Sequence, residues 1–374
     1  MQLRGDRMPF GGAERRSRPW RVAVLLALIG GGILLTRLVE AKRVKPLFLP
    51  TATPTQTAFS YQEEGEAQFS AGNLEKAIKA YQQATRLEPD NGKLWAKLAR
   101  IQTYSSALMA TEAERNDRLE QARASVDRAV AVDEENDLAW AVRALVYDWL
   151  AGAEPATATR EEYFRIAETS AKQALLLEPD SALALAYEAE VLVDQQRYAE
   201  GLDKIGEALA RDPNSLDVQR VYGTVLESNA YYERAIEAYE QAAKIAPNLT
   251  FLYLRIGANY RRLGDSDQAL KYFEKAVQIN QQLGIQDPVP YLAIGRTYLQ
   301  DGEFFIAARN LEQAVLIDPG NPELLGFLGV IYFKARNYEN AEATLRCAVD
   351  DCNDQAHAVL LCDTLAILDC DDEA

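Results

Sequence analysis

The stretch YLRIGANYRRLGDSDQALKYFEKAVQIN, residues 253–280, decides the fold. Apolar residues recur at helical spacing in two segments, one on each side of the Gly264–Asp265 dipeptide. The pattern predicts two amphipathic helices joined by a tight turn. Neither helix can bury its apolar face alone, so the pair needs neighbours of the same kind.

The same pattern recurs along most of the chain, with three small residues in step in successive units. The three series are Gly65, Ala99, Ala144, Ala189, Gly223, Gly257, Gly295 and Gly329; Ala77, Ala122, Ala167, Gly201, Ala235, Ala269, Ala307 and Ala341; and Ala84, Ala129, Ala174, Ala208, Ala242, Ala276, Ala314 and Ala348. Small side chains are needed where paired helices cross closely. Stacked units bury one another's apolar faces, which predicts a solenoid.

This pattern resembles the tetratricopeptide repeat (TPR). The matching residues in one unit are Tyr253, Ile256, Gly257, Tyr260, Gly264, Ala269, Phe273 and Ala276, and those in the next are Tyr291, Ile294, Gly295, Tyr298, Gly302, Ala307, Leu311, Ala314 and Pro319. The resemblance implies an all-α TPR superhelix that binds a protein or peptide partner. No catalytic motif, cofactor-binding motif or metal motif accompanies it, so we expect no enzyme, no cofactor and no metal.

Eight units fill residues 58–353. Their expected bounds are 58–91, 92–136, 137–181, 182–215, 216–249, 250–287, 288–321 and 322–353. The second and third units each have eleven additional residues between their helices, which predicts longer helices or protruding loops. The sixth has four additional residues before Pro288, about one helical turn.

The N-terminal region predicts a membrane anchor. We expect a basic tail at 1–19, a transmembrane signal-anchor at 20–39 and a Pro/Thr-rich linker at 40–57. The uncharged core, Val22 to Thr36, spans roughly 22 Å as a helix, and the flanking arginines and Trp20 can extend it to the roughly 30 Å of a bilayer. A cleaved signal peptide and a buried helix of a soluble protein are the alternatives.

Charge bears on topology and on partners. Six arginines precede the apolar core and four Lys/Arg follow it, which favours a cytoplasmic N-terminus and an extracytoplasmic TPR domain. Residues 1–57 hold ten Lys/Arg and three Asp/Glu, so the remainder carries −23 in a chain whose net charge is −16. Such an acidic body argues against nucleic-acid binding. We expect a membrane-anchored scaffold in envelope assembly or secretion; the alternative is a cytoplasm-facing adaptor whose cysteines stay reduced or bind metal.

The resemblance implies that the first helices of successive units line a concave groove. The expected groove residues are Arg220, Leu254, Arg261, Leu292, Arg296, Leu299, Phe333 and Lys334. Projection of the last four units onto the groove gives five basic residues and one acidic residue. The hypothesis is that Arg220, Arg261 and Arg296 hold an acidic or C-terminal-carboxylate peptide. The alternative is that these arginines pair with nearby Asp/Glu along the helices.

All four cysteines lie near the C-terminus, at Cys347, Cys352, Cys362 and Cys370, with the single histidine, His357, among them. In an exported domain they predict two disulfides, with Cys347–Cys362 the preferred pair of the three connectivities. Zinc is the alternative, but C-x4-C-x9-C-x7-C fits known structural sites poorly. A reactive Cys–His pair lacks a third orienting group. We expect 354–374 to form a capping helix and an acidic tail.

Overall fold

The computed structural model describes residues 19–40, 56–109, 111–155 and 157–350. The chain divides into two compact units, residues 1–55 and residues 56–374. Cys352, Cys362, Cys370, His357 and the expected capping helix lie outside the described residues.

The described part of the first unit is one helix, α1 (Pro19–Glu40). Its large apolar side chains are exposed, Leu28 by 69% and Leu26 by 64%. The twenty residues Pro19–Leu38 are long and apolar enough to cross a membrane, judged by length and composition. The expected apolar helix is therefore present.

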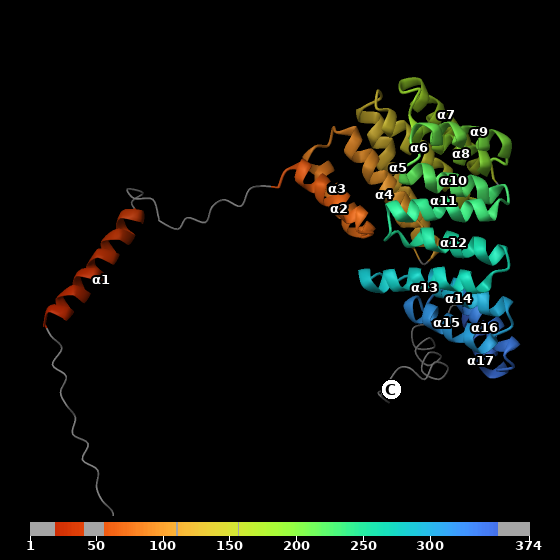
Figure 1. The fold of residues 1–374 in the computed structure, drawn as a ribbon. Helices are drawn as coiled ribbons and strands as arrows, with labels where there is room; N and C mark the ends of the chain where they lie inside the picture. The colour runs from red at the N-terminus through yellow and green to blue at the C-terminus, as the bar shows by residue number, and fades with distance from the viewer. Residues whose placement is uncertain (1–18, 41–55, 110, 156, 351–374) are drawn as a thin grey trace, which may run out of the picture. The chain divides into compact units, whose positions relative to one another are not determined.

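In the second unit, every regular element of the described residues is an α-helix (Figure 1). The helices are α2 (Ala58–Ser70), α3 (Leu74–Leu87), α4 (Gly92–Ser106), α5 (Glu112–Val132), α6 (Asp137–Ala153), α7 (Ala158–Leu177), α8 (Ala182–Asp194), α9 (Tyr198–Arg211), α10 (Leu216–Ser228), α11 (Tyr232–Ile245), α12 (Thr250–Arg262), α13 (Ser266–Leu283), α14 (Val289–Gln300), α15 (Phe304–Ile317), α16 (Pro322–Lys334) and α17 (Tyr338–Asp350). They pack as consecutive pairs, which confirms the all-α solenoid.

The additional residues of the second and third units mainly lengthen helices. Helix α5 has 21 residues and α7 has 20, whereas the equivalent α9 and α11 have 14 each. The additional residues before Pro288 likewise extend α13 to 18 residues. The longer second helices change the outer wall of the array and leave the helix-pair plan intact.

The small residues stand where the paired helices touch. A Cβ added to Gly257 would lie 2.5 Å from the Phe273 ring, and one added to Gly295 would collide with the Leu311 side chain. The alanines of the other two series, such as Ala235 and Ala276, are buried, except Ala348, which is half-buried. Close helix contact therefore explains the small-residue pattern.

The turns between units have a repeated construction. Asn and Ser side chains cap the first helices: Asn91, Asn136, Ser181 and Ser215 each accept a hydrogen bond from the backbone N–H three residues later. A tryptophan stands four residues after two of these N-caps. The indole N–H of Trp95 donates to the Pro89 carbonyl oxygen at 2.9 Å, and that of Trp140 donates to the Glu134 carbonyl oxygen at 2.9 Å. These contacts fix the angle between successive units.

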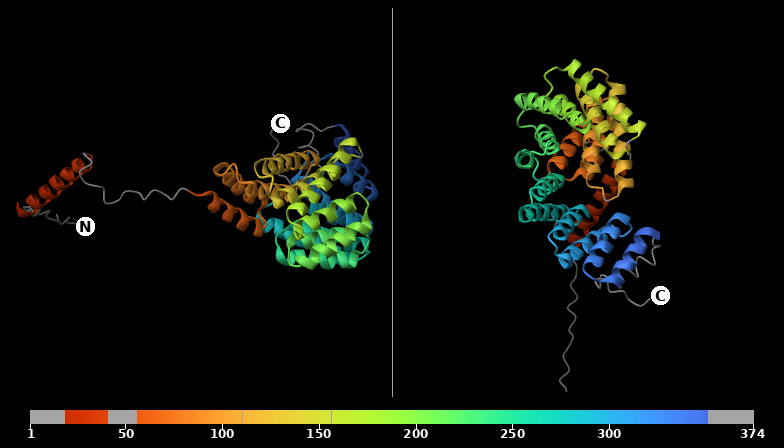
Figure 2. Two further views of the ribbon diagram at one scale, coloured as in Figure 1. Left: turned by 90° about the horizontal axis from the view of Figure 1, so that it is seen from above. Right: turned by 90° about the vertical axis from the view of Figure 1, so that its right-hand side faces the viewer.

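The array winds into a superhelix whose first unit meets a later one (Figures 1 and 2). The Asn248 side-chain amide, in the turn before α12, donates to the Ala71 carbonyl oxygen at 3.2 Å. Gly72, with φ +80°, packs so closely that an added Cβ would lie 2.5 Å from the Asn248 carbonyl oxygen. Tyr104 of α4 also packs on Phe251 of α12, with ring centroids 5.7 Å apart.

Apolar packing is least continuous near α13 and α14. One buried cluster runs from Ala58 to Ile279, and a second runs from Ala307 to Cys347. A third cluster between them has three buried members, Ala269, Phe273 and Ile294. The last two repeats therefore form a partly separate packing unit.

Candidate functional site

A buried polar and aromatic cluster joins α4, α8 and α10. Tyr187 donates to Asp217 at 2.7 Å, Tyr104 donates to the same carboxylate, and Arg100 lies 2.9 Å from it. Burial opposes ionisation of Asp217. Arg100, the Tyr104 hydroxyl, Arg220 and the Tyr187 hydroxyl outweigh that effect and lower its pKa.

Arg220, one of the expected groove residues, belongs to this buried cluster. Its guanidinium makes two hydrogen bonds of 2.6 Å to Glu190, and the two residues are 3% and 4% exposed. The guanidinium also lies 5.3 Å from the Tyr104 ring centroid and 5.8 Å from that of Trp149. The structure places Arg220 in the wall, bound to a carboxylate from the preceding repeat.

Beyond this cluster the interior opens into a cavity of about 590 Å³. Its lining comes from α4, α5, α6, α8, α10, α12, α13 and α14 and their adjoining turns. Four of the expected groove residues, Leu254, Arg261, Leu292 and Arg296, do line it. All four lie on the expected inner face of two neighbouring first helices, with Leu254 and Arg261 on α12 and Leu292 and Arg296 on α14.

Arg261 and Arg296 are two of the basic residues that line the cavity. Burial, together with Arg296 and Arg262, lowers the pKa of Arg261. Among the described residues no carboxylate lies within ion-pair distance of Arg261, which donates to the Ala293 carbonyl oxygen at 3.4 Å. Arg296 reaches Glu323 at 2.9 Å, while its Nε is buried without an acceptor in the described part.

The cavity also has acidic lining residues on α6 and α8, which the repeat register does not predict. Asp148 of α6 is fully buried, and neither of its carboxylate oxygens accepts a hydrogen bond from a described residue. Its neighbour Asp194, the last residue of α8, is exposed to the cavity. The lining as a whole has four arginines and four acidic residues, not the expected excess of base.

The pKa values of Asp148 and Asp194 are higher than those of ordinary surface acids. Burial, followed by Asp194 and Glu190, raises the pKa of Asp148 well above its usual value. Burial and Glu190 raise the pKa of Asp194 to about 6, against the opposing effect of Arg255. The sequence signal for these acidic lining residues is Asp148, a single acidic residue inside the apolar run of α6.

The other expected groove residues lie elsewhere. Leu299 is half-buried against the second apolar cluster, and Lys334 is exposed. Phe333 is 60% exposed, stacks edge-on with Tyr338 at 5.6 Å, and lines a separate apolar hollow of about 530 Å³ with α17. Cys347 is buried in the second cluster. Its pairing stays a prediction.

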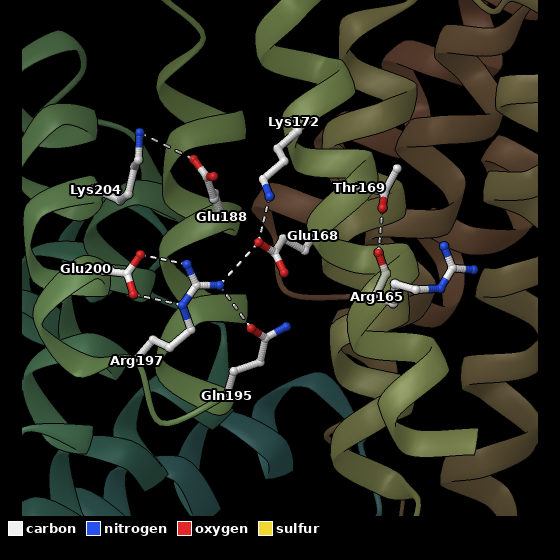
Figure 3. Close-up of polar contacts among 9 residues, drawn as sticks. All are labelled: Arg165, Glu168, Thr169, Lys172, Glu188, Gln195, Arg197, Glu200 and Lys204. Atoms are coloured by element: carbon white, nitrogen blue, oxygen red, sulfur yellow. Dashed lines mark hydrogen bonds and ion pairs between the residues drawn. The ribbon is translucent and has the colours of Figure 1, made fainter. Parts of the chain in front are cut away.

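The outer surface shows what ordinary arginine pairing looks like in this protein (Figure 3). Arg197 lies between Glu200 of α9, at 2.6 Å, and Glu168 of α7, at 3.1 Å, and Glu168 also contacts Lys172 at 2.7 Å. Exposed networks of this kind contribute little stability. Arg261 differs because it lines a cavity beside other arginines and has no carboxylate of the described residues within ion-pair distance.

Family models for the tetratricopeptide repeat match residues 249–319, 160–215, 292–356 and 221–249, and a TPR repeat model matches 65–103. These matches together cover more than half of the chain. The chain therefore belongs to the tetratricopeptide-repeat proteins, which are generally non-enzymatic scaffolds for protein–protein interaction.

Individual relatives are distant. The BBSome complex member BBS4 of Bos taurus is 28% identical over 110 residues, which are 29% of this chain and a fifth of that protein. The APC/C hetero-tetramer Cut9-Hcn1 has a TM-score of 0.57 at 11% identity and covers 81% of this chain and 55% of that one. A monomeric mutant of IFIT1 with Gppp-AAAA has a TM-score of 0.54 at 19% identity and covers 79% and 78%. These two structures show the fold alone.

Proposed function

We propose that the protein is a membrane-anchored TPR scaffold whose cavity holds an acidic segment or C-terminal carboxylate of a partner protein. The observation that carries the proposal is Arg261, a half-buried cation beside two other arginines with no carboxylate from the described residues in reach. An anion bound there would relieve the repulsion among the arginines and gain charge-assisted hydrogen bonds.

Arg296, in the lining of the same cavity, can also bind an acidic group. Arg296 keeps a buried Nε–H without an acceptor in the described part, and its guanidinium carbon lies 4.2 Å from the Phe327 ring centroid, which fixes its orientation. Leu254 and Leu292 line the same cavity and supply apolar contacts between the charged groups. An acidic peptide with one or two apolar side chains fits this lining.

The test is charge reversal with a matched control. A fluorescein-labelled nonapeptide with several glutamates and a free C-terminus is titrated into the full-length protein in detergent, with fluorescence anisotropy as the measurement. We expect Arg261→Glu with Arg296→Glu to weaken binding at least about tenfold, because each charge contact is replaced by repulsion.

The control carries the same charge change on the outer surface. Lys271→Glu with Arg309→Glu alters two exposed cations on α13 and α15, away from the cavity. Binding by this variant should stay within about twofold of the unmodified protein, as expected for exposed charges. Equal affinity of the cavity variant and the unmodified protein would overturn the groove proposal.

The placement outside the cytoplasm is the second part of the proposal. Support comes from α1 and from the excess of arginine before it. Two disulfides among Cys347, Cys352, Cys362 and Cys370 would suit that compartment, as would a role in envelope assembly or secretion. Intact mass with and without reductant should show a loss of about four hydrogens in the native protein. Four free thiols would instead favour a cytoplasm-facing adaptor.

A further inference from the structure

We propose that Asp148 and Asp194 form a subsite for an organic cation, the ammonium or guanidinium group of a basic residue in the bound segment. This inference rests on the proposed function and adds a second requirement to it. The partner segment would carry an acidic group toward α12 and α14 and a basic group toward α6 and α8. A purely acidic segment would use only half of the cavity.

The first support is that Asp148 is unsatisfied. Its side chain is fully buried, it lines the cavity, and neither carboxylate oxygen has a donor among the described residues. A buried carboxylate without a donor is costly and is normally paired or hydrogen-bonded. The cost is removed if a cation enters and supplies donors.

The second support is that the other acids of the cavity are already bound. Glu190 receives both hydrogen bonds of Arg220. Glu227 receives hydrogen bonds from Arg262 at 2.5 Å, Tyr239 at 3.0 Å and Asn259 at 3.2 Å. Asp148 and Asp194 are thus the acidic lining residues that remain for a ligand.

The surroundings favour an organic cation over a metal ion. Trp149 follows Asp148 in α6 and lines the cavity, as does Phe251, and aromatic faces attract ammonium and guanidinium groups. Among the described residues no group of three or more Asp, Glu, His or Cys is arranged to hold a metal. Two carboxylates and a tryptophan suit a basic side chain better than a divalent ion, which needs more oxygen ligands.

The charged groups that face the pair define its resting state. Glu190 of α8 disfavours ionisation of both carboxyls, while Arg220 of α10 favours it and Arg255 of α12 favours it at Asp194. These effects keep the pKa values of both carboxyls raised when the site is empty. A bound ammonium group would favour the ionised carboxylates and so lower those pKa values.

The first experiment uses peptides of equal length with full-length protein in detergent. The acidic nonapeptide is compared with a panel in which one lysine replaces each neutral position in turn, measured by fluorescence anisotropy. We expect the lysine in one register to tighten binding about tenfold, the value of one charge-assisted contact. Asp194→Asn should abolish that gain, measured relative to the acidic peptide in the same variant.

Asp203→Asn is the matched control, since Asp203 is an exposed aspartate on the neighbouring helix α9 and does not line the cavity. It should keep the whole gain. If no register gains affinity, or if the gain persists in Asp194→Asn, the cation subsite is refuted while the acidic-peptide proposal stands. Failure of the acidic peptide itself, with no effect of Arg261→Glu, would refute the proposed function instead.

A second measurement does not depend on any peptide. The pH titration of tryptophan fluorescence reports the carboxyls beside Trp149, and Asp194→Asn provides the blank. We expect n-butylammonium chloride to lower the midpoint by about half a pH unit relative to sodium chloride at equal ionic strength, because a bound cation favours the ionised pair. No shift, or a shift with calcium chloride alone, would overturn the assignment to an organic cation.

Discussion

Arg220 and Glu190 make a closed pair in the superhelix interior, with two hydrogen bonds of 2.6 Å and almost no exposed surface. Removing one partner of such a pair leaves the other charge buried alone, whereas replacing both with apolar residues is often tolerated. The pair therefore acts as a structural contact between α8 and α10. Its residues should influence stability far more than partner binding.

Arg220→Ala should lower the free energy of unfolding by about 3–5 kcal/mol, because Glu190 is left uncompensated. The measurement is urea unfolding followed by circular dichroism. Arg220→Met combined with Glu190→Met should recover most of the loss. Arg309→Ala, on the exposed face of α15, serves as the control and should change stability by less than about 0.5 kcal/mol. An equal effect of Arg220→Ala and Arg309→Ala would contradict the buried pair.

The Asp148–Asp194 pair gives stability a pH dependence with a definite sign. Both carboxyls have a folded pKa above the ordinary value of 3.8, that of Asp194 at about 6. The folded protein therefore binds protons more tightly than the unfolded chain between about pH 4 and pH 6. The contribution of this pair to stability therefore falls as pH rises through that window and stays reduced above it.

Asp148→Asn should stabilise the protein at pH 7.5 by about 1–3 kcal/mol, since its amide can donate to Asp194 and the buried carboxylate disappears. At pH 4.5 the gain should be much smaller. Burial raises the pKa of Asp287 to about 6. Asp287 and His357 are present in both the unmodified protein and the variant, so they do not affect the difference in stability between the two. A gain that is the same at both pH values would show that the raised pKa of Asp148 does not affect stability.

At the scale of the helix pair, the contact between first and second helices depends on positions with no room for a side chain. Gly295 on α14 meets Leu311 on α15, where an added Cβ would collide with the leucine side chain. Gly206, in the interior of α9, has nothing within 4 Å of the same added atom. These two helical glycines have opposite expected responses to alanine.

Gly295→Ala should destabilise the protein by about 1–3 kcal/mol through overpacking. Gly206→Ala should stabilise it by about 0.5–1 kcal/mol, because alanine is the better helix former and meets no neighbour. Thermal unfolding by calorimetry separates the two. Stabilisation by both substitutions would show that α14 and α15 can move apart without cost.

The repeat register predicts the fold well and the site only in part. Gly257, Gly295 and the alanine series fix which helices pair, and the expected inner faces of α12 and α14 contribute Arg261 and Arg296 to one cavity. The same register could not show that Glu190, one repeat earlier, already binds Arg220. That contact depends on how tightly successive repeats curve, which is set by packing between units and is not encoded in any one unit.

At the scale of the whole array, the superhelix returns on itself. Nearest-neighbour contacts alone would make each repeat sensitive only to those beside it. The hydrogen bond from Asn248 to Ala71 and the close approach at Gly72 connect the first unit to the turn between the fifth and sixth. Destabilising this contact should therefore affect both places at once.

Gly72→Ala should increase hydrogen exchange in α2, α3 and the start of α12, because the new Cβ would lie 2.5 Å from the Asn248 carbonyl oxygen. Gly264→Ala imposes a similar backbone strain, at φ +81° against +80°, but has no neighbour within 4 Å. It should affect only its own turn. If both variants showed only a local response, the contact between Gly72 and Asn248 would contribute nothing to stability.

The closure also determines how the array resists a mechanical load. A pull on residue 56 acts first on α2, the outermost helix of an otherwise open-ended stack. In a simple solenoid the terminal repeat would peel away under such a load while its neighbours stayed in place. Here the turn that follows α2 is hydrogen-bonded to Asn248, which lies 177 residues after Ala71. The force is thereby shared across five repeats, so an array tethered at this end would keep its cavity shape under tension.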